Sequence, residues 1–158
     1  VRYAALFSHM GEEDAGKVIR TLKTDNETHR LVKKLVASLS AKLPNFASER
    51  FEKDVAHLLT ENSFDDLDKI ISLREAFDSY RGADTENLIK IRECAEKLIK
   101  ENACLSIKSL DVSGKDLADA GIPQSAEMGR ILKKLLYLVI EGKVENKKES
   151  LVEAAKRI

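Results

Sequence analysis

The regular spacing of apolar residues constrains this chain more than any other feature of its sequence. Leucine, isoleucine and valine recur every three or four residues, and one such stripe is Leu31, Val32, Leu35, Val36 and Leu39. A period between three and four places these side chains on one face of a helix. Only seven glycines and two prolines interrupt the 158 residues, and alternation of apolar and polar residues is almost absent. The sequence therefore predicts an all-α fold.

Polar residues and glycines mark where these helices are expected to begin and end. The expected caps are Thr24, Ser63, Asp84 or Thr85, and Asn146. The first and the last of them are followed three residues later by a glutamate, which is the spacing of a capping box. Helix ends are expected at Gly82 and Gly142, because glycine readily adopts the left-handed conformation that closes many helices.

One segment, Leu105–Ser113, lacks a helical period and is the best candidate for an internal boundary. Residues 1–104 are predicted to form a multi-helix body, and residues 105–158 a smaller helical tail domain. Because the chain starts inside a helical pattern, we also expect it to be part of a longer protein.

Within the tail domain, the boundary segment is expected to be an extended linker that packs through Ile107, Leu110 and Val112. Helices are expected at about 114–120 and at 126–141. The second of these has a strong apolar stripe, and its end at Gly142 suits a left-handed residue.

The charge balance excludes some classes of protein and leaves others open. Lysine plus arginine total 27 and aspartate plus glutamate total 27, so the formal net charge is zero. This balance argues against a global polycation but allows a local basic face. No apolar run reaches the roughly 18–20 residues that span a bilayer. The two cysteines, Cys94 and Cys104, suggest neither a disulfide framework nor a metal cluster, which indicates a reducing cytoplasm.

The helix expected over 126–141 carries the most suggestive polar pattern. Arg130, Lys133, Lys134 and Tyr137 are spaced so that they share the face opposite its apolar stripe. Cations beside an aromatic hydroxyl suit contacts with phosphate and ribose, although a solvated helix face is the simpler interpretation. Two further groups of cations are Arg30, Lys33 and Lys34, and Lys143, Lys147 and Lys148.

A short turn, Ser113–Asp116 with the sequence SGKD, opens the first tail helix. Backbone N–H groups at a helix start, with a glycine and a lysine beside them, can hold a phosphate. A plain capped turn is the alternative.

No catalytic or metal site is predicted. His9 resembles the histidine of HD-type phosphohydrolases, but Met10 stands where their metal-binding carboxylate belongs. The Asp66-Leu67-Asp68 pattern resembles the metal-binding pair of nucleotidyltransferases, yet it lies within a helical pattern and is interpreted as surface charge. His29 and His57 have no partner at a useful spacing.

Motifs in the second half of the chain resemble the C-terminal region of bacterial tRNA nucleotidyltransferases, the CCA-adding and poly(A) polymerase family. They are, in order, Ser113–Asp116 (SGKD), Gly121–Pro123 (GIP), Gly129–Leu132 (GRIL) and Glu141–Asn146 (EGKVEN). The opening, Arg2–Gly11 (RYAALFSHMG), and Leu22–Glu27 (LKTDNE) are similar to the start of the helical body in the same family.

The resemblance implies a specific division of labour. Family enzymes have a catalytic head that binds two Mg²⁺ ions, a neck that reads CTP and ATP, a body and a tail. This chain would be the body and tail, which bind the acceptor and T arms of tRNA while the head adds CMP and AMP to the 3′ end. It would hold no cofactor and have no activity alone, and its partners would be tRNA and its own head and neck.

Because RNA helices are recognised largely through phosphates and shape, exposed cations are the expected contacts. The predicted RNA-binding residues are Lys108, Lys115, Arg130, Lys133, Lys134, Lys143 and Lys147, with Ser113 and Gly114 shaping the turn. Two alternatives remain: a helical protein-interaction module without RNA binding, favoured by the acidic middle of the chain, and a decayed HD-type phosphohydrolase. The sequence indicates neither an oligomeric state nor whether the enzyme adds CCA, A or poly(A).

Overall fold

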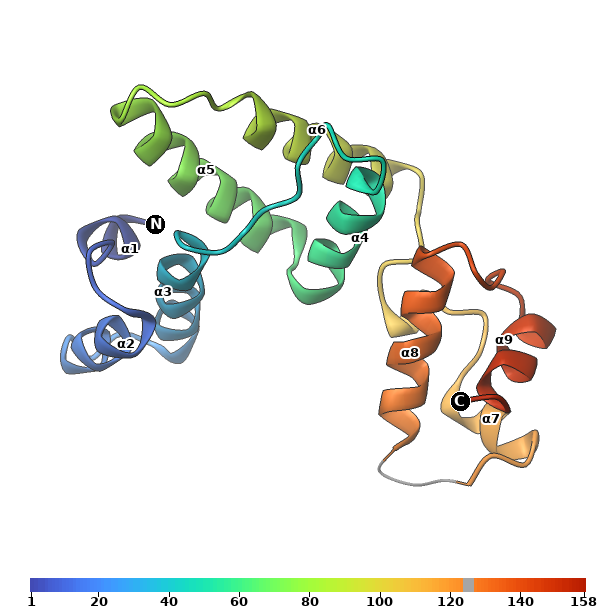
Figure 1. Ribbon diagram of the computed structural model, residues 1–158. Coiled ribbons are helices and arrows are strands. Elements are labelled where there is room, and N and C mark those ends of the chain that lie inside the picture. The colour runs from blue at the N-terminus through green and yellow to red at the C-terminus, as the bar shows by residue number, and fades with distance from the viewer. Residues whose placement is uncertain (124–126) are drawn as a thin grey trace. The chain divides into compact units, whose positions relative to one another are not determined.

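A computed structural model describes residues 1–123 and 127–158 and is all-α, as predicted (Figure 1). In these ranges it has helices and no strand. The helices are α1 (Arg2–Leu6), α2 (Glu12–Thr21), α3 (Asn26–Ser38), α4 (Phe51–Glu61), α5 (Phe64–Tyr80), α6 (Glu86–Lys100), the 3₁₀ turn η1 (Ile107–Ser109), α7 (Gly114–Asp119), α8 (Met128–Ile140) and α9 (Lys148–Ala155).

The chain divides into two compact units, and neither is a single stretch of sequence. Unit 1 contains residues Val1–Phe51 and Asn62–Ala95, whereas unit 2 contains Glu52–Glu61 and Glu96–Ile158. Helix α4 thus belongs almost wholly to unit 2, and α6 contributes to both units. The boundary expected between residues 104 and 105 stays a prediction.

Unit 1 is built around α3, which packs against α1, α2 and α5. Its buried core is Ala4, Phe7, Ala15, Ile19, Val32, Leu35, Val36, Ile70 and Leu73. Helices α2 and α3 approach closely at Gly16, where an added Cβ would lie 3.0 Å from the Lys33 side chain.

Unit 2 has a second core, formed where α7, α8 and α9 pack against one another. Its buried residues are Leu110, Val112, Leu117, Leu135, Leu136, Leu151 and Ala155. Leu110 and Val112 pack into this core as expected, but the expectation for Ile107 is wrong because it is 39% exposed. Residues 107–109 form the turn η1 instead of extended chain, which directs Ile107 outward.

The helix caps confirm some of the sequence-based expectations. Ser63 caps α5, where its hydroxyl accepts a hydrogen bond from the Asp66 N–H at 3.1 Å. Thr24 is wrong as the cap of α3, because Asp25 takes that position and accepts from the Thr28 N–H at 2.8 Å. The Thr24 hydroxyl instead donates to the Ile19 carbonyl of the preceding helix.

Asn146 is also wrong as a helix cap. Lys147 occupies the cap position of α9, and the Asp111 carboxylate accepts from the Lys148 N–H at 3.2 Å. Asn146 accepts from the Asp111 N–H at 2.9 Å and donates to the Ser109 carbonyl at 3.0 Å. These three bonds tie the segment before α7 to the start of α9, 35 to 37 residues later in the chain.

Helix α8 ends as its sequence predicts. Its last residue, Ile140, is followed by the C-cap Glu141 and then by Gly142, whose φ of +70° lies in the left-handed region. The Gly142 and Lys143 N–H groups donate to the Val139 and Leu138 carbonyls, both at 2.9 Å, which closes the helix. The expected start at Ala126 lies outside the described residues. No helix in the described ranges is long and apolar enough to cross a membrane.

Candidate nucleic-acid interface

One face of α8 carries three exposed cations. Arg130, Lys133 and Lys134 lie on this face, while Leu135 and Leu136 on the other side are buried in the core of unit 2. The Arg130 side chain lies 3.4 Å from Glu127. It is nevertheless 84% exposed, so most of its N–H donors face water. The buried side of α8 thus fixes the helix, and the cations face solvent.

Tyr137 lies beside Lys133, as predicted, but it is partly buried and not fully exposed. Its ring is partly buried against His57 of α4, with ring centroids 5.0 Å apart and planes at 83°. The Lys133 ammonium lies over the same ring, 5.6 Å from its centroid. Tyr137 therefore supports the position of Lys133 and of α4 within unit 2.

Two more contacts attach α4 to the end of α8. The Lys53 ammonium donates to the Glu141 carbonyl at 2.9 Å, and the His57 ring nitrogen lies 3.0 Å from the Glu141 carboxylate. A cation at a helix C-terminus satisfies carbonyls that lack a partner within the helix. The sequence could not reveal this group because its members are more than 80 residues apart.

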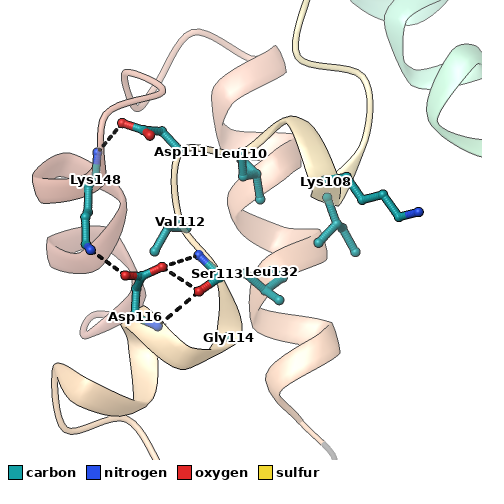
Figure 2. Close-up of a pocket in the computed structure, with 10 residues that line it drawn as sticks. Lys108, Leu110, Asp111, Val112, Ser113, Gly114, Asp116, Leu132 and Lys148 are labelled. Carbon is teal, nitrogen blue, oxygen red and sulfur yellow. Dashed lines mark hydrogen bonds and ion pairs between the residues drawn. The ribbon is translucent and has the colours of Figure 1, made fainter.

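The segment before α7, α7 itself, α8 and Lys148 together line an open pocket of about 490 Å³ (Figure 2). Leu110, Val112 and Leu132 form its apolar wall. On one side, Lys148 forms an ion pair with Asp116, whereas the side chain of Lys108 extends away from this pair into solvent.

The Ser113–Asp116 turn is a reciprocal capping box. The Ser113 hydroxyl accepts from the Asp116 N–H at 3.2 Å, and the Asp116 carboxylate accepts from the Ser113 N–H at 2.9 Å. Hydrogen bonds from Lys148 and then from Ser113 hold the pKa of Asp116 well below its usual range. The start of α7 thus already carries a carboxylate, and the capped turn is the interpretation that the structure supports.

Gly114 brings α7 close to α8. A Cβ added there would lie 3.3 Å from the Met128 side chain, so the missing side chain allows this approach. Ser113 and Gly114 therefore shape the turn, and their contact with RNA stays a prediction.

The remaining predicted cations are all exposed. Lys147 pairs with Glu145 at 2.7 Å, which raises the pKa of the lysine and lowers that of the glutamate. Within the described ranges, no ion pair is formed by Lys108, Lys115, Lys134 or Lys143. These four ammonium groups are therefore both exposed and, in the part of the chain that the structure describes, unpaired.

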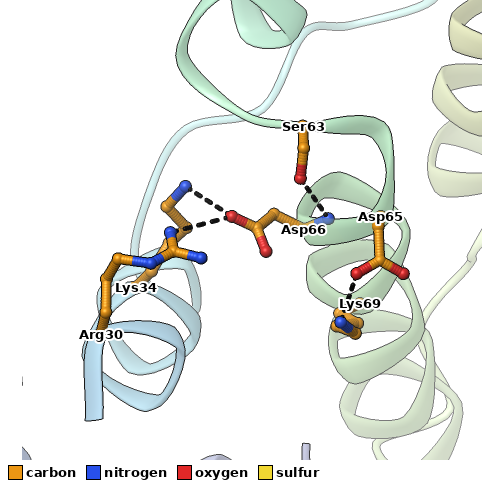
Figure 3. Close-up of polar contacts among 6 residues, drawn as sticks. All are labelled: Arg30, Lys34, Ser63, Asp65, Asp66 and Lys69. Atoms are coloured by element: carbon orange, nitrogen blue, oxygen red, sulfur yellow. Dashed lines mark hydrogen bonds and ion pairs between the residues drawn. The ribbon is translucent and has the colours of Figure 1, made fainter. Parts of the chain in front are cut away.

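The cations of α3 are not available in the same way (Figure 3). Arg30 and Lys34 both contact one carboxylate oxygen of Asp66 in α5, at 3.1 and 3.0 Å. Lys33 lies 3.4 Å from Glu12. The expected basic patch on α3 is therefore already paired within unit 1.

Asp66 itself corrects a second expectation. It is only 6% exposed, so it is a buried partner of two cations and not a surface charge. Asp68 is paired with Arg92 at 2.8 Å, and Arg92 also binds Glu75. Among the residues described, no group of three or more histidine, cysteine or acidic side chains could hold a metal ion.

Together, these features define a class of protein: an all-α chain with a small helical unit that presents cations along one helix. A family model described as "tRNA nucleotidyltransferase domain 2 putative" matches residues 1–155, and the chain belongs to this family. The resemblance seen in the sequence motifs is thereby confirmed.

One curated relative extends this result. A CCA-adding enzyme of Levilactobacillus brevis is 45% identical over 47 residues, which is 30% of this chain and 12% of the relative. The chain thus matches only a small part of that protein's length. The comparison with solved structures finds no match.

Proposed function

We propose that this chain is the tRNA-binding helical region of a CCA-adding tRNA nucleotidyltransferase. One observation carries the proposal: in a chain of this family, one face of α8 presents Arg130, Lys133 and Lys134 to solvent. The name of the relative, a CCA-adding enzyme, supports the choice of reaction within the family.

The proposed role is to hold the acceptor and T arms through their backbone. Phosphates repeat regularly along an RNA helix, so cations on a rigid helix can contact them in any tRNA. The proposed contacts are Lys108, Ser113, Gly114, Lys115, Arg130, Lys133, Lys134, Lys143 and Lys147. Because α8 is fixed by buried Leu135 and Leu136, little order has to be gained when the RNA binds.

Catalysis is assigned elsewhere in the parent enzyme. Its head and neck would transfer CMP and AMP from CTP and ATP to the tRNA 3′ end, with two Mg²⁺ ions bound by the head. We assign no catalytic residue to this chain and expect it to bind tRNA without extending it.

A triple variant tests the proposal. Replacing Arg130, Lys133 and Lys134 with alanine should weaken binding of tRNA that lacks its CCA end by roughly tenfold or more. The dependence of log affinity on log salt should become shallower by about two to three, one for each lost phosphate contact. Fluorescence anisotropy at several salt concentrations measures both quantities.

The matched control removes the same charge from unit 1. Arg2, Lys17 and Lys42 are exposed, and their joint replacement with alanine should leave affinity and salt dependence close to those of the unchanged chain. Equal losses of tRNA affinity in the two triple variants would show that binding depends only on the net charge of the chain, and would contradict the proposal.

The protein-interaction alternative keeps only part of what favoured it. Its basis was the zero net charge and the acidic middle of the chain, and within that middle Asp65, Asp66 and Asp68 are engaged by Lys69, by Arg30 and Lys34, and by Arg92, while Glu61 is exposed. Of these carboxylates, Asp66 is buried in the packing of unit 1, whereas the pair of Asp65 with Lys69 lies at its surface.

A further inference from the structure

Unit 1 contains a second cavity, of about 400 Å³, which the proposed tRNA contacts do not use. We call it the α3–α5 cavity, because it lies among the end of α3, the second half of α5 and the segment after α1. Its polar lining is Ser8, His9, Ser40, Arg74, Asp78 and Arg81. Two arginines, a histidine, one carboxylate and two hydroxyl groups thus line the same cavity.

Arg74 is held in place by the end of α3. One terminal nitrogen of its guanidinium donates to the Ser38, Leu39 and Ala41 carbonyls, at 2.7, 3.2 and 2.9 Å. These carbonyls would otherwise repel an anion, and the arginine neutralises that end of the helix.

The other donors of Arg74 remain available. Neither of its two other guanidinium nitrogens has a hydrogen-bond partner among the described residues. No buried side-chain nitrogen or oxygen in those residues lacks a partner, so these nitrogens are reached by solvent. A fixed guanidinium with three accessible N–H groups suits recognition of an oxyanion.

Arg81 adds a second guanidinium, 6.0 Å from the centre of the Phe77 ring. Stacking of this kind leaves the N–H groups at the edge of the guanidinium free to bind an anion. Asp78 offsets one positive charge, which leaves one of the two arginine charges in excess even when His9 is neutral.

We propose that the α3–α5 cavity binds a phosphate group carried by an organic molecule. Two guanidinium groups and the Ser8 hydroxyl provide the donors that phosphate oxygens need, whereas the Ser40 hydroxyl already donates to the Ala37 carbonyl at 3.3 Å. The cavity is much larger than the roughly 30 Å³ that one water occupies, and Met10, Val36 and Leu39 supply an apolar wall for the group attached to the phosphate. The phosphate could belong to a nucleic-acid backbone or to a free phosphorylated compound.

Inorganic phosphate tests the site directly. It is titrated into the full 158-residue chain at constant ionic strength, while backbone amides are followed by NMR. We expect saturable shifts at Ser8, His9 and Arg81. Arg81→Ala should weaken phosphate binding fivefold or more, because Arg81 is exposed and its loss leaves the core intact.

Arg2→Ala removes the same charge from an exposed position in unit 1 outside the cavity, and it should bind phosphate like the unchanged chain. Shifts that do not saturate, or equal affinities in the two variants, would overturn the proposal.

A second titration distinguishes the two sources of phosphate. If tRNA shifts the same amides and displaces phosphate, the ligand is a nucleic-acid backbone; if phosphate binds and tRNA leaves these amides unchanged, it is a free phosphorylated compound. The site does not depend on the proposed function. In the Arg130, Lys133 and Lys134 triple variant, phosphate should still shift the cavity amides even though tRNA binding is weakened.

Discussion

Asp66 shows how one residue can organise a helix pair. Its carboxylate is buried at the start of α5 and contacts both Arg30 and Lys34 of α3. Burial alone would raise the pKa of this carboxyl, but the hydrogen bonds from Lys34 and Arg30 outweigh that effect and lower it. A lowered pKa means that folding favours the ionised form.

The pH dependence of Asp66→Asn follows from this sign. At neutral pH the variant should be less stable by about 1–3 kcal/mol, because two cations lose a charged partner. The stabilising effect of Asp66 is present above its unfolded pKa of about 4 and is lost as pH falls through the lower folded value. The stability difference between the two proteins, measured by urea unfolding, should therefore shrink below about pH 4.

Asp65→Asn is the control for this measurement, since Asp65 is exposed and pairs with Lys69 one turn along the same helix. Its effect should be under about 1 kcal/mol at any pH. If Asp65→Asn lowered the free energy of unfolding as much as Asp66→Asn, the result would contradict the inference that burial makes the ion pairs of Asp66 stabilising.

At the scale of elements, local sequence predicts helices better than it predicts their contacts. Ser63 and Gly142 act as expected because a cap and a left-handed residue depend on their immediate neighbours. Asn146 does not, since Ser109 and Asp111, far away in the sequence, bind its side chain. The pairing of Arg30 with Asp66 is hidden for the same reason, as 36 residues separate them.

Two glycines at opposite ends of α8 should respond oppositely to alanine. Gly142→Ala should cost about 1 kcal/mol, because a φ of +70° strains a residue with a Cβ. Gly129→Ala should stabilise the chain by up to about 1 kcal/mol, because it lies inside the helix with open space for a Cβ. Thermal unfolding of both variants measures these stability changes. If both melting temperatures shift in the same direction, the left-handed conformation of Gly142 does not determine the stability change of Gly142→Ala.

At the scale of the whole molecule, the sequence predicts the tail domain and the cations on α8. It does not predict that α4, which comes much earlier in the chain, belongs to the same unit. The core of α7, α8 and α9 draws all of its buried residues from positions 110–155. Helix α4 joins unit 2 through His57 and Lys53, and the sequence between residues 41 and 104 carries no motif that announces this.

The predicted domain boundary can be tested with residues 105–158 alone. Because this stretch contains the buried residues, from Leu110 to Ala155, of the core of α7, α8 and α9, while Cys104 packs against that core from outside the stretch, we expect it to unfold cooperatively but at a lower temperature than the full chain. A domain of this size has only about 3–5 kcal/mol of stability, and it would lose the contacts from α4. Circular dichroism during heating checks the expectation.

The matching control is Leu135→Ala in the same fragment, which should abolish the transition, since truncating a fully buried leucine costs about 2–5 kcal/mol. If the unaltered fragment shows no cooperative transition, the boundary at residues 104 and 105 is wrong and unit 2 needs α4 to fold.

The path of the chain between the two units has a consequence for its synthesis. The chain changes unit after Phe51, after Glu61 and after Ala95. On the ribosome, unit 1 is therefore complete once residue 95 has emerged. Helix α4 emerges before residue 95 as well, but α8, which it contacts in unit 2, is synthesised much later. During that interval His57 and Lys53 of α4 lack Tyr137 and Glu141, the partners that α8 and its end supply. Nascent chains paused between residues 62 and 141 should thus be the forms in which α4 is held least firmly.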